Sequence, residues 1–241
     1  MLNSLRRIRR NLLMSKNARS YVLYAFGEVV LVMVGILLAL QVSNWNENRK
    51  RQDQLNVILQ TIKEDLARDT LVAEGIIRFY DTINKYSLKV MNNEFDSENI
   101  ESCMMCRNLL TLYQPYTIQQ KGYNMLLNFS NDTSNETDSL LVSIRQFYKA
   151  TTDIIEDSNE FVKTETLKNL DYFKTKPWFV DLLQGRFTEE MKVYFGESYD
   201  FKNRVASNNI LGAGNHSAFI KVHNDGAKEL ISEIATRLDQ P

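Results

Sequence analysis

The longest apolar run in the chain extends from Tyr21 to Ser43, where 23 residues contain one charged side chain, Glu28. A helix of that length is about 35 Å long, enough to cross the roughly 30 Å hydrocarbon core of a bilayer. Trp45 follows the run at the position where an interfacial aromatic residue is expected. The pattern therefore predicts a single transmembrane helix over residues 21–45.

Beyond this run, apolar residues recur at alternating steps of four and three. The positions are Leu55, Leu59, Ile62, Leu66, Asp69, Ala73, Ile76, Tyr80 and Ile83. This spacing is typical of a packed helix seam and predicts one long helix that ends near Met91. Further apolar residues beside the seam favour burial in a bundle over an isolated two-stranded coil. Asp69, the polar member of the series, fits either a residue that fixes the register of the helix packing or a position at a solvated edge, and we expect the second.

The remaining pattern is also helical, and no segment alternates with period two for long. Helices are predicted at 104–113, at 118–129, from Leu140 to about Leu170, and from Tyr199 to the C-terminal region, with a kink or break at Gly212 and Gly214. Lys176-Pro177 interrupts the series, and the aromatic residues that follow are expected to pack against the end of the bundle. The fold class is predicted as all-α, with residues 46–241 forming a helical bundle.

Charge predicts the orientation in the membrane. Residues 1–20 contain six basic and no acidic residues, and basic flanks remain in the cytoplasm. The prediction is a bacterial inner-membrane protein with a cytoplasmic leader and a periplasmic domain at 46–241, held by an uncleaved anchor because no small-residue cleavage site follows the apolar run. Arg6, Arg7, Arg9 and Arg10 lie between apolar residues at helical spacing, which fits either an amphipathic helix on the membrane surface or a disordered basic tail.

One block of sequence resembles a known family. Residues 27–50 read GEVVLVMVGILLALQVSNWNENRK, and RRIRRNLL and YVLYAF precede them. This is similar to the N-terminal signature of uncharacterised single-span Bacteroidota proteins, the domain-of-unknown-function family 6090, with the strongest likeness over residues 1–50. The resemblance implies an inner-membrane location and carries no assigned activity.

Glu28 is the most informative single residue. A carboxylate inside a span costs a few kcal/mol unless it is protonated, paired or turned toward protein, so Glu28 is a candidate proton carrier or polar helix contact. The alternative is that the span begins at Val29 and Glu28 lies among the headgroups. Gly27, Gly35 and Ala39 share one helical face, and small residues there permit close approach of a second helix.

Cys103 and Cys106 form a C-x-x-C pair. In an oxidising compartment a local structural disulfide is the expected state, with free thiols as the alternative. Redox chemistry would require a thioredoxin-like β-α-β setting that the sequence lacks, haem attachment would require His at position 107, which is Arg, and zinc would require two more ligands nearby.

No other group of residues indicates catalysis, and no cofactor or metal is expected. His216 and His223 are seven residues apart, and solvated or core-edge histidines are a better interpretation than metal ligands. Acidic pairs such as Glu64 and Asp65 fit solvated helix faces. We therefore expect no enzyme and no nucleic-acid partner.

Two functions remain as hypotheses. The first is a non-enzymatic scaffold, sensor or accessory subunit of a membrane complex, contacting the bilayer and either another membrane protein or its own copies through the transmembrane and long helices. The second is a stator-like energy-coupling subunit with Glu28 as the proton carrier.

Overall fold

The computed structural model describes residues 18–129 and 138–239, which form helices joined by turns and one extended segment, with no strand among them. The predicted all-α class is confirmed. The chain divides into two compact units, Met1–Leu55 and Asn56–Pro241. Arg6, Arg7, Arg9 and Arg10 of the leader lie outside the described residues.

The first unit holds the N-terminal part of helix α2, which runs from Ala18 to Met91. Its apolar side chains are exposed, and Leu31 reaches 74%. Among the described residues, α2 is the one helix that is long and apolar enough to cross a membrane, and none of its apolar window is buried inside the protein. These features are consistent with a single-pass membrane protein.

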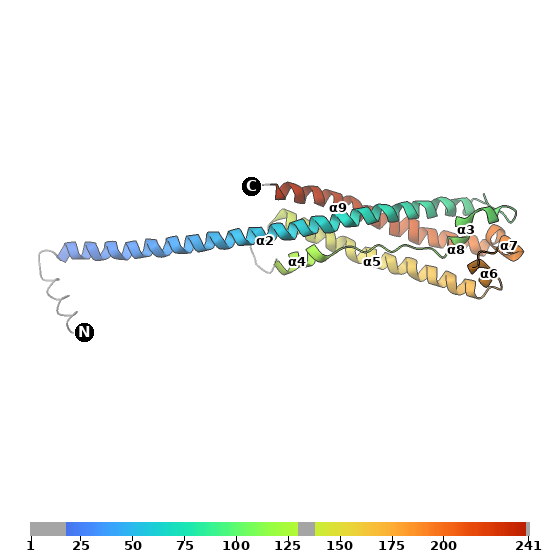
Figure 1. The fold of residues 1–241 in the computed structure, drawn as a ribbon, viewed down its shortest axis with the longest axis horizontal. Helices are drawn as coiled ribbons and strands as arrows, with labels where there is room; N and C mark the ends of the chain where they lie inside the picture. The colour runs from blue at the N-terminus through green and yellow to red at the C-terminus, as the bar shows by residue number, and fades with distance from the viewer. Residues whose placement is uncertain (1–17, 130–137, 240–241) are drawn as a thin grey trace. The chain divides into compact units, whose positions relative to one another are not determined.

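The second unit begins at Asn56 and is a bundle of long and short helices (Figure 1). After α2 come η1 (Ile100–Ser102), α3 (Met104–Asn108), α4 (Lys121–Phe129), α5 (Ser139–Lys174), α6 (Phe179–Leu183), α7 (Glu189–Glu197), α8 (Tyr199–Asn209), η3 (Ile210–His216) and α9 (Ser217–Leu238). Three rods lie side by side in this unit. Helix α5 packs on the nearly continuous α8–η3–α9, and the second part of α2 is joined to α9 by ion pairs such as Lys228 with Glu74. Short helices α3, α6 and α7 gather at one end, and α4 lies at the other.

The predicted seam of α2 forms the core of the second unit. Leu59, Ile62, Leu66, Tyr80 and Ile83 are each no more than 2% exposed, because steps of four and three keep them on one side of the helix. The predicted end of the helix at Met91 is confirmed.

The helices predicted at 104–113 and 118–129 are shorter than expected. Between α3 and α4 the chain turns at 109–111 and then runs extended through residues 112–120, a segment that we call the strap. Pro115 disfavours helix at the residue before it, and Tyr116, Thr117 and Ile118 favour extended backbone. Tyr116 and Ile118 are buried while their neighbours are exposed, so the strap alternates with period two and turns one face into the bundle.

The aromatic residues after Pro177 pack against the end of the bundle, as predicted. Phe173, Trp178, Phe195 and Phe201 are 4% exposed or less and meet mostly edge to face, with ring centroids 4.9–5.8 Å apart. Cys103 and Cys106 lie in the same cluster, so this end of the bundle has a core of its own.

The predicted irregularity at Gly212 and Gly214 is confirmed as a seven-residue π-helix, η3. The wide turns of a π-helix are rare and occur mostly as local bulges in α-helices. Gly212 is required here because a β-carbon would lie 2.8 Å from the ring of Tyr80. The π-helix therefore sets the C-terminal rod close against α2.

Candidate functional site

Glu28, Gly35 and Ala39 share one face of α2, whereas Gly27, which was predicted to share it, lies about 80° around the helix from Gly35. Glu28, Gly35 and Ala39 are separated by seven and four residues, which on an α-helix places them within about 20° of one direction. All three are exposed, as is Gly27, and a β-carbon at Gly27 or Gly35 would meet nothing within 4 Å. The carboxylate thus lies on the same face as the small residues, and this face is free to receive another helix.

A set of buried and half-buried polar side chains holds the strap inside the bundle. Tyr80 on α2 donates its hydroxyl to the Gln114 carbonyl (3.0 Å) and accepts from the Gln114 N–H (3.2 Å). Asn159 on α5 accepts from the Tyr116 N–H (2.9 Å) and donates to the Tyr116 carbonyl (2.7 Å). Side chains thereby supply the partners that a neighbouring strand would supply in a sheet.

Two carboxylates of α2 continue this pattern, and the expectation that they are solvated was wrong. Asp69 is 2% exposed and accepts from the Gln119 N–H at 3.0 Å, while Asp65 is 4% exposed and accepts from the Gly122 N–H at 2.7 Å. Burial raises the pKa of Asp69, and the nearby His223 and the bond from the Gln119 N–H act in the opposite direction. Both carboxylates accept hydrogen bonds from backbone N–H groups, Asp69 from the strap and Asp65 from the first turn of α4. These N–H groups have no partner within a helix and therefore require a side-chain acceptor.

His216 and His223 are both fully buried, so their expected position at a solvated or core-edge site was also wrong. His223 Nε2 lies 3.9 Å from Asp69 Oδ2, and its Nδ1 is 3.1 Å from the Thr151 hydroxyl. His216 Nδ1 is 2.7 Å from the Ser158 hydroxyl, and its ring packs edge-on against Tyr80. The two histidines serve different hydrogen bonds and do not converge on one ligand.

Burial lowers the pKa of His216 to about 4 from its ordinary value of 6.5. The folded state therefore binds fewer protons than the unfolded state between these values, so the contribution of His216 to stability is complete above pH 6.5 and is lost as the pH falls toward 4. We expect this residue to remove roughly 3 kcal/mol of folding free energy over that window. Asp69 acts in the opposite sense, because its raised pKa favours the folded state as it becomes protonated.

The measurement is the denaturation midpoint of the full chain at several pH values between 7 and 4. His216→Gln keeps a polar group opposite Ser158 and removes the titration, so its stability is expected to depend less steeply on pH than that of the native chain. Equal slopes for the two proteins would show that His216 is not the titrating group.

Cys103 and Cys106 are joined in a disulfide, and the described chain has no free cysteine. Both are nearly sealed from solvent, at 5% and 0% exposure, so the sulfur atoms offer no open surface for exchange.

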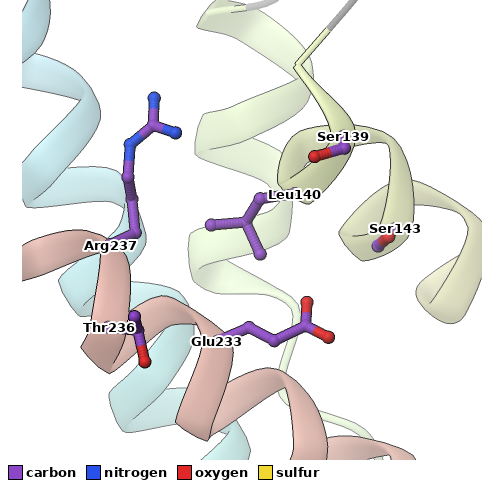
Figure 2. Close-up of a pocket in the computed structure, with 6 residues that line it drawn as sticks. All are labelled: Ser139, Leu140, Ser143, Glu233, Thr236 and Arg237. Atoms are coloured by element: carbon purple, nitrogen blue, oxygen red, sulfur yellow. The ribbon is translucent and has the colours of Figure 1, made fainter.

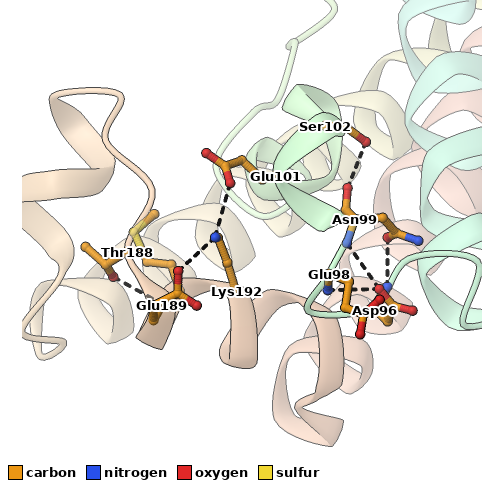
Figure 3. Close-up of polar contacts among 9 residues, drawn as sticks. Asp96, Glu98, Asn99, Glu101, Ser102, Thr188, Glu189 and Lys192 are labelled. Carbon is orange, nitrogen blue, oxygen red and sulfur yellow. Dashed lines mark hydrogen bonds and ion pairs between the residues drawn. The ribbon is translucent and has the colours of Figure 1, made fainter.

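The turn that leads to this pair is tied by its own polar groups (Figure 3). Asp96 accepts from the N–H groups of Glu98 and Asn99, and Ser102 donates to the Asn99 carbonyl at 2.7 Å. Lys192 of α7 reaches Glu189 at 2.8 Å and Glu101 at 3.4 Å, and these carboxylates raise its pKa. The contacts within the turn are local, and the ion pair between Lys192 and Glu101 fastens the η1 turn to α7.

A shallow cleft of about 360 Å³ lies between the start of α5 and the end of α9 (Figure 2). Its lining residues are Ser139, Leu140, Ser143, Glu233, Thr236 and Arg237. Arg237 is bound to Asp138 at 3.0 Å, and Asp138 also accepts from the Leu140 N–H at the start of α5. Arg237 therefore joins α9 to the start of α5. In the part of the chain that the structure describes, no three His, Cys, Asp or Glu side chains gather as metal ligands would.

Sequence reasoning missed the residues that bind the strap. Tyr80 and Asp69 could have been noticed as polar members of an otherwise apolar seam, since a seam position is buried whatever residue occupies it. Asn159 gave no such signal, because its partner is the backbone of a segment that was predicted as partly helical, and Asp65, whose partner is Gly122 of α4, gave none either.

Comparison with known proteins gives a match to one family. The family model described as a family of unknown function (DUF6090) matches residues 28–149, about half of the chain. The match includes Glu28, the strap and the start of α5. Neither the curated proteins nor the solved structures contain a match to this chain.

Proposed function

The chain belongs to this family of unknown function, DUF6090, and we propose that it is a non-enzymatic subunit of a membrane protein complex, anchored by the apolar part of α2. The observation that carries the proposal is the contrast between the two units. The apolar window of α2 has no side chain buried inside the protein, whereas the second unit buries its own core and uses its inward polar groups to hold the strap.

We further propose that the anchor spans the inner membrane once, with residues 1–20 in the cytoplasm and residues 46–241 in the periplasm. The basic leader supports this orientation. The disulfide between Cys103 and Cys106 supports an oxidising compartment for the bundle.

Helix association within the membrane is part of the proposal. Glu28, Gly35 and Ala39 form one exposed face, on which small residues allow close backbone approach and a carboxylate gains from a polar partner. A multi-span protein that offers a hydroxyl, amide or basic side chain at the depth of Glu28 fits this face.

The experiment is purification of the tagged full chain from its own membrane in mild detergent, with native Glu28 and with Glu28→Gln. An accessory subunit is expected to bring a second membrane protein at a fixed ratio, and Glu28→Gln is expected to weaken that association while the chain still reaches the membrane. Purification of the chain without any second protein would contradict the proposal.

The stator-like alternative rests on the same carboxylate acting as a proton carrier. It requires that Glu28→Gln abolish the activity of the complex while its composition stays unchanged, because glutamine keeps the size and polarity of the side chain but cannot release a proton. Full activity of an intact complex that contains Glu28→Gln would eliminate this alternative.

A further inference from the structure

A groove of about 210 Å³ lies between α5 and the η3–α9 rod of the second unit. Ile154 and Phe161 form its wall on α5, Leu211 and Phe219 form the opposite wall, and Ser158 lies at its floor. Phe161 is 61% exposed and Ile154 is 40% exposed. Each is a large apolar side chain that would gain roughly 1.5–3 kcal/mol from full burial.

The hydroxyl at the floor of the groove is already bonded, and Asn215 is the polar lining residue of the facing wall. The hydroxyl of Ser158 is already shared between the Ile155 carbonyl, at 2.9 Å, and His216 Nδ1, at 2.7 Å. His216 belongs to the π-helix η3, so the same segment that departs from α geometry also forms the side of the groove. The interior therefore suits an apolar side chain, and its volume is that of one large residue.

The rim of the groove is negatively charged. Asp157 lines it, and Asp153 lies one turn earlier on the same side of α5. The nearby Lys163 is paired with Glu160 at 3.1 Å. The facing wall contains no lysine or arginine from Ile210 to Ile220. An apolar groove with an acidic rim is complementary to a partner that carries apolar anchors between basic residues.

We propose that this groove binds the apolar face of a basic amphipathic helix from a partner protein. The inference rests on the proposed function, since it specifies where the subunit meets its complex outside the transmembrane helix. Such a helix would place one large apolar side chain between Phe161 and Phe219 and would set its basic residues against Asp153 and Asp157. The acidic rim would repel the same acidic face of a second copy of the chain, and it would also repel an anionic bilayer. Both are therefore disfavoured as occupants of the groove.

The test uses the full chain in phosphatidylcholine nanodiscs and a labelled synthetic helix of leucine and lysine, about 14 residues long so that it can form a helix. A matched peptide with glutamate in place of lysine is the control for charge, and empty nanodiscs are the control for lipid binding. The variants are Phe161→Ser, Asp157→Lys and, as a control on an exposed apolar residue outside the groove, Leu183→Ser.

The expected result is binding of the basic peptide to the native chain and to Leu183→Ser with equal affinity. Binding to Phe161→Ser and to Asp157→Lys is expected to be at least about tenfold weaker, the loss typical of a residue at the centre of an interface. The proposal would be overturned if both peptides bound equally, or if the peptide bound to empty nanodiscs alone. It would also be overturned if both groove variants kept the native affinity, or if the chain associated with itself and Phe161→Ser removed that association.

The peptide-binding result is independent of the composition of the particle that is purified from the native membrane. A purified particle without any second protein contradicts the proposed function even if the peptide binds. A particle whose second protein is fully retained by both groove variants preserves the proposed function and overturns the groove as its contact.

Discussion

Asn159→Ala is expected to lower the free energy of unfolding of the second unit by roughly 3 kcal/mol, because it leaves two backbone groups of the buried Tyr116 without partners. For a unit of this size the loss corresponds to a fall of about 10 °C in the melting temperature. The measurement is thermal unfolding of the full chain in detergent, followed by circular dichroism.

The matched control for this variant is Glu160→Ala at the adjacent residue of α5. Glu160 is exposed and paired with Lys163, and an exposed pair of this kind contributes less than about 1 kcal/mol. If Asn159→Ala melted within a degree or two of Glu160→Ala, the strap would not be held by these hydrogen bonds.

Gly122→Ala is expected to be at least as damaging, with a loss of roughly 3 kcal/mol or more. A β-carbon at Gly122 would lie 2.6 Å from the backbone nitrogen of Ile62 and 2.8 Å from its α-carbon. Since a helix backbone cannot move aside as a flexible side chain can, α4 must shift away from α2, and the 2.7 Å bond between the Gly122 N–H and Asp65 is lost with it. The same thermal measurement reports the effect.

Gly75→Ala provides a control of opposite sign. Gly75 is a helical residue of α2, and a β-carbon added there would meet nothing within 4 Å. Alanine is therefore expected to raise stability by about 0.5–1 kcal/mol through its better helix propensity. Similar melting temperatures for Gly122→Ala and Gly75→Ala would mean that α4 does not pack on α2 as described.

The long helices could be predicted from the sequence because their apolar positions repeat over many turns. The seam from Leu59 to Ile83 is an example. The break near Gly212 could be predicted from its two glycines. The strap could not be predicted, since its nine residues are too few to give a reliable period and the side chains that bind it lie 34 to 50 residues away in sequence. The seam spacing indicated burial of Asp69, but its hydrogen-bond partner Gln119, which lies on the strap, could not be found from the sequence.

The two candidate binding surfaces also differ in how far the sequence could predict them. The shared face of Glu28, Gly35 and Ala39 is a property of one helix, and its spacing is visible in the sequence. The groove joins Phe161 of α5 to Phe219 of α9, and only the packing of the two helices brings these residues together. A face on a single helix can therefore be proposed from spacing alone, whereas a groove between two helices requires the structure.

The most direct test of the central claim is the mass of the particle that the full chain forms when it is extracted from its own membrane, determined by native mass spectrometry. A membrane subunit of the kind proposed predicts one discrete mass that contains this chain and a second membrane protein in a fixed ratio. A mass equal to the chain alone, or to a whole number of copies of it, would contradict the proposal that the protein is a subunit of a larger membrane complex.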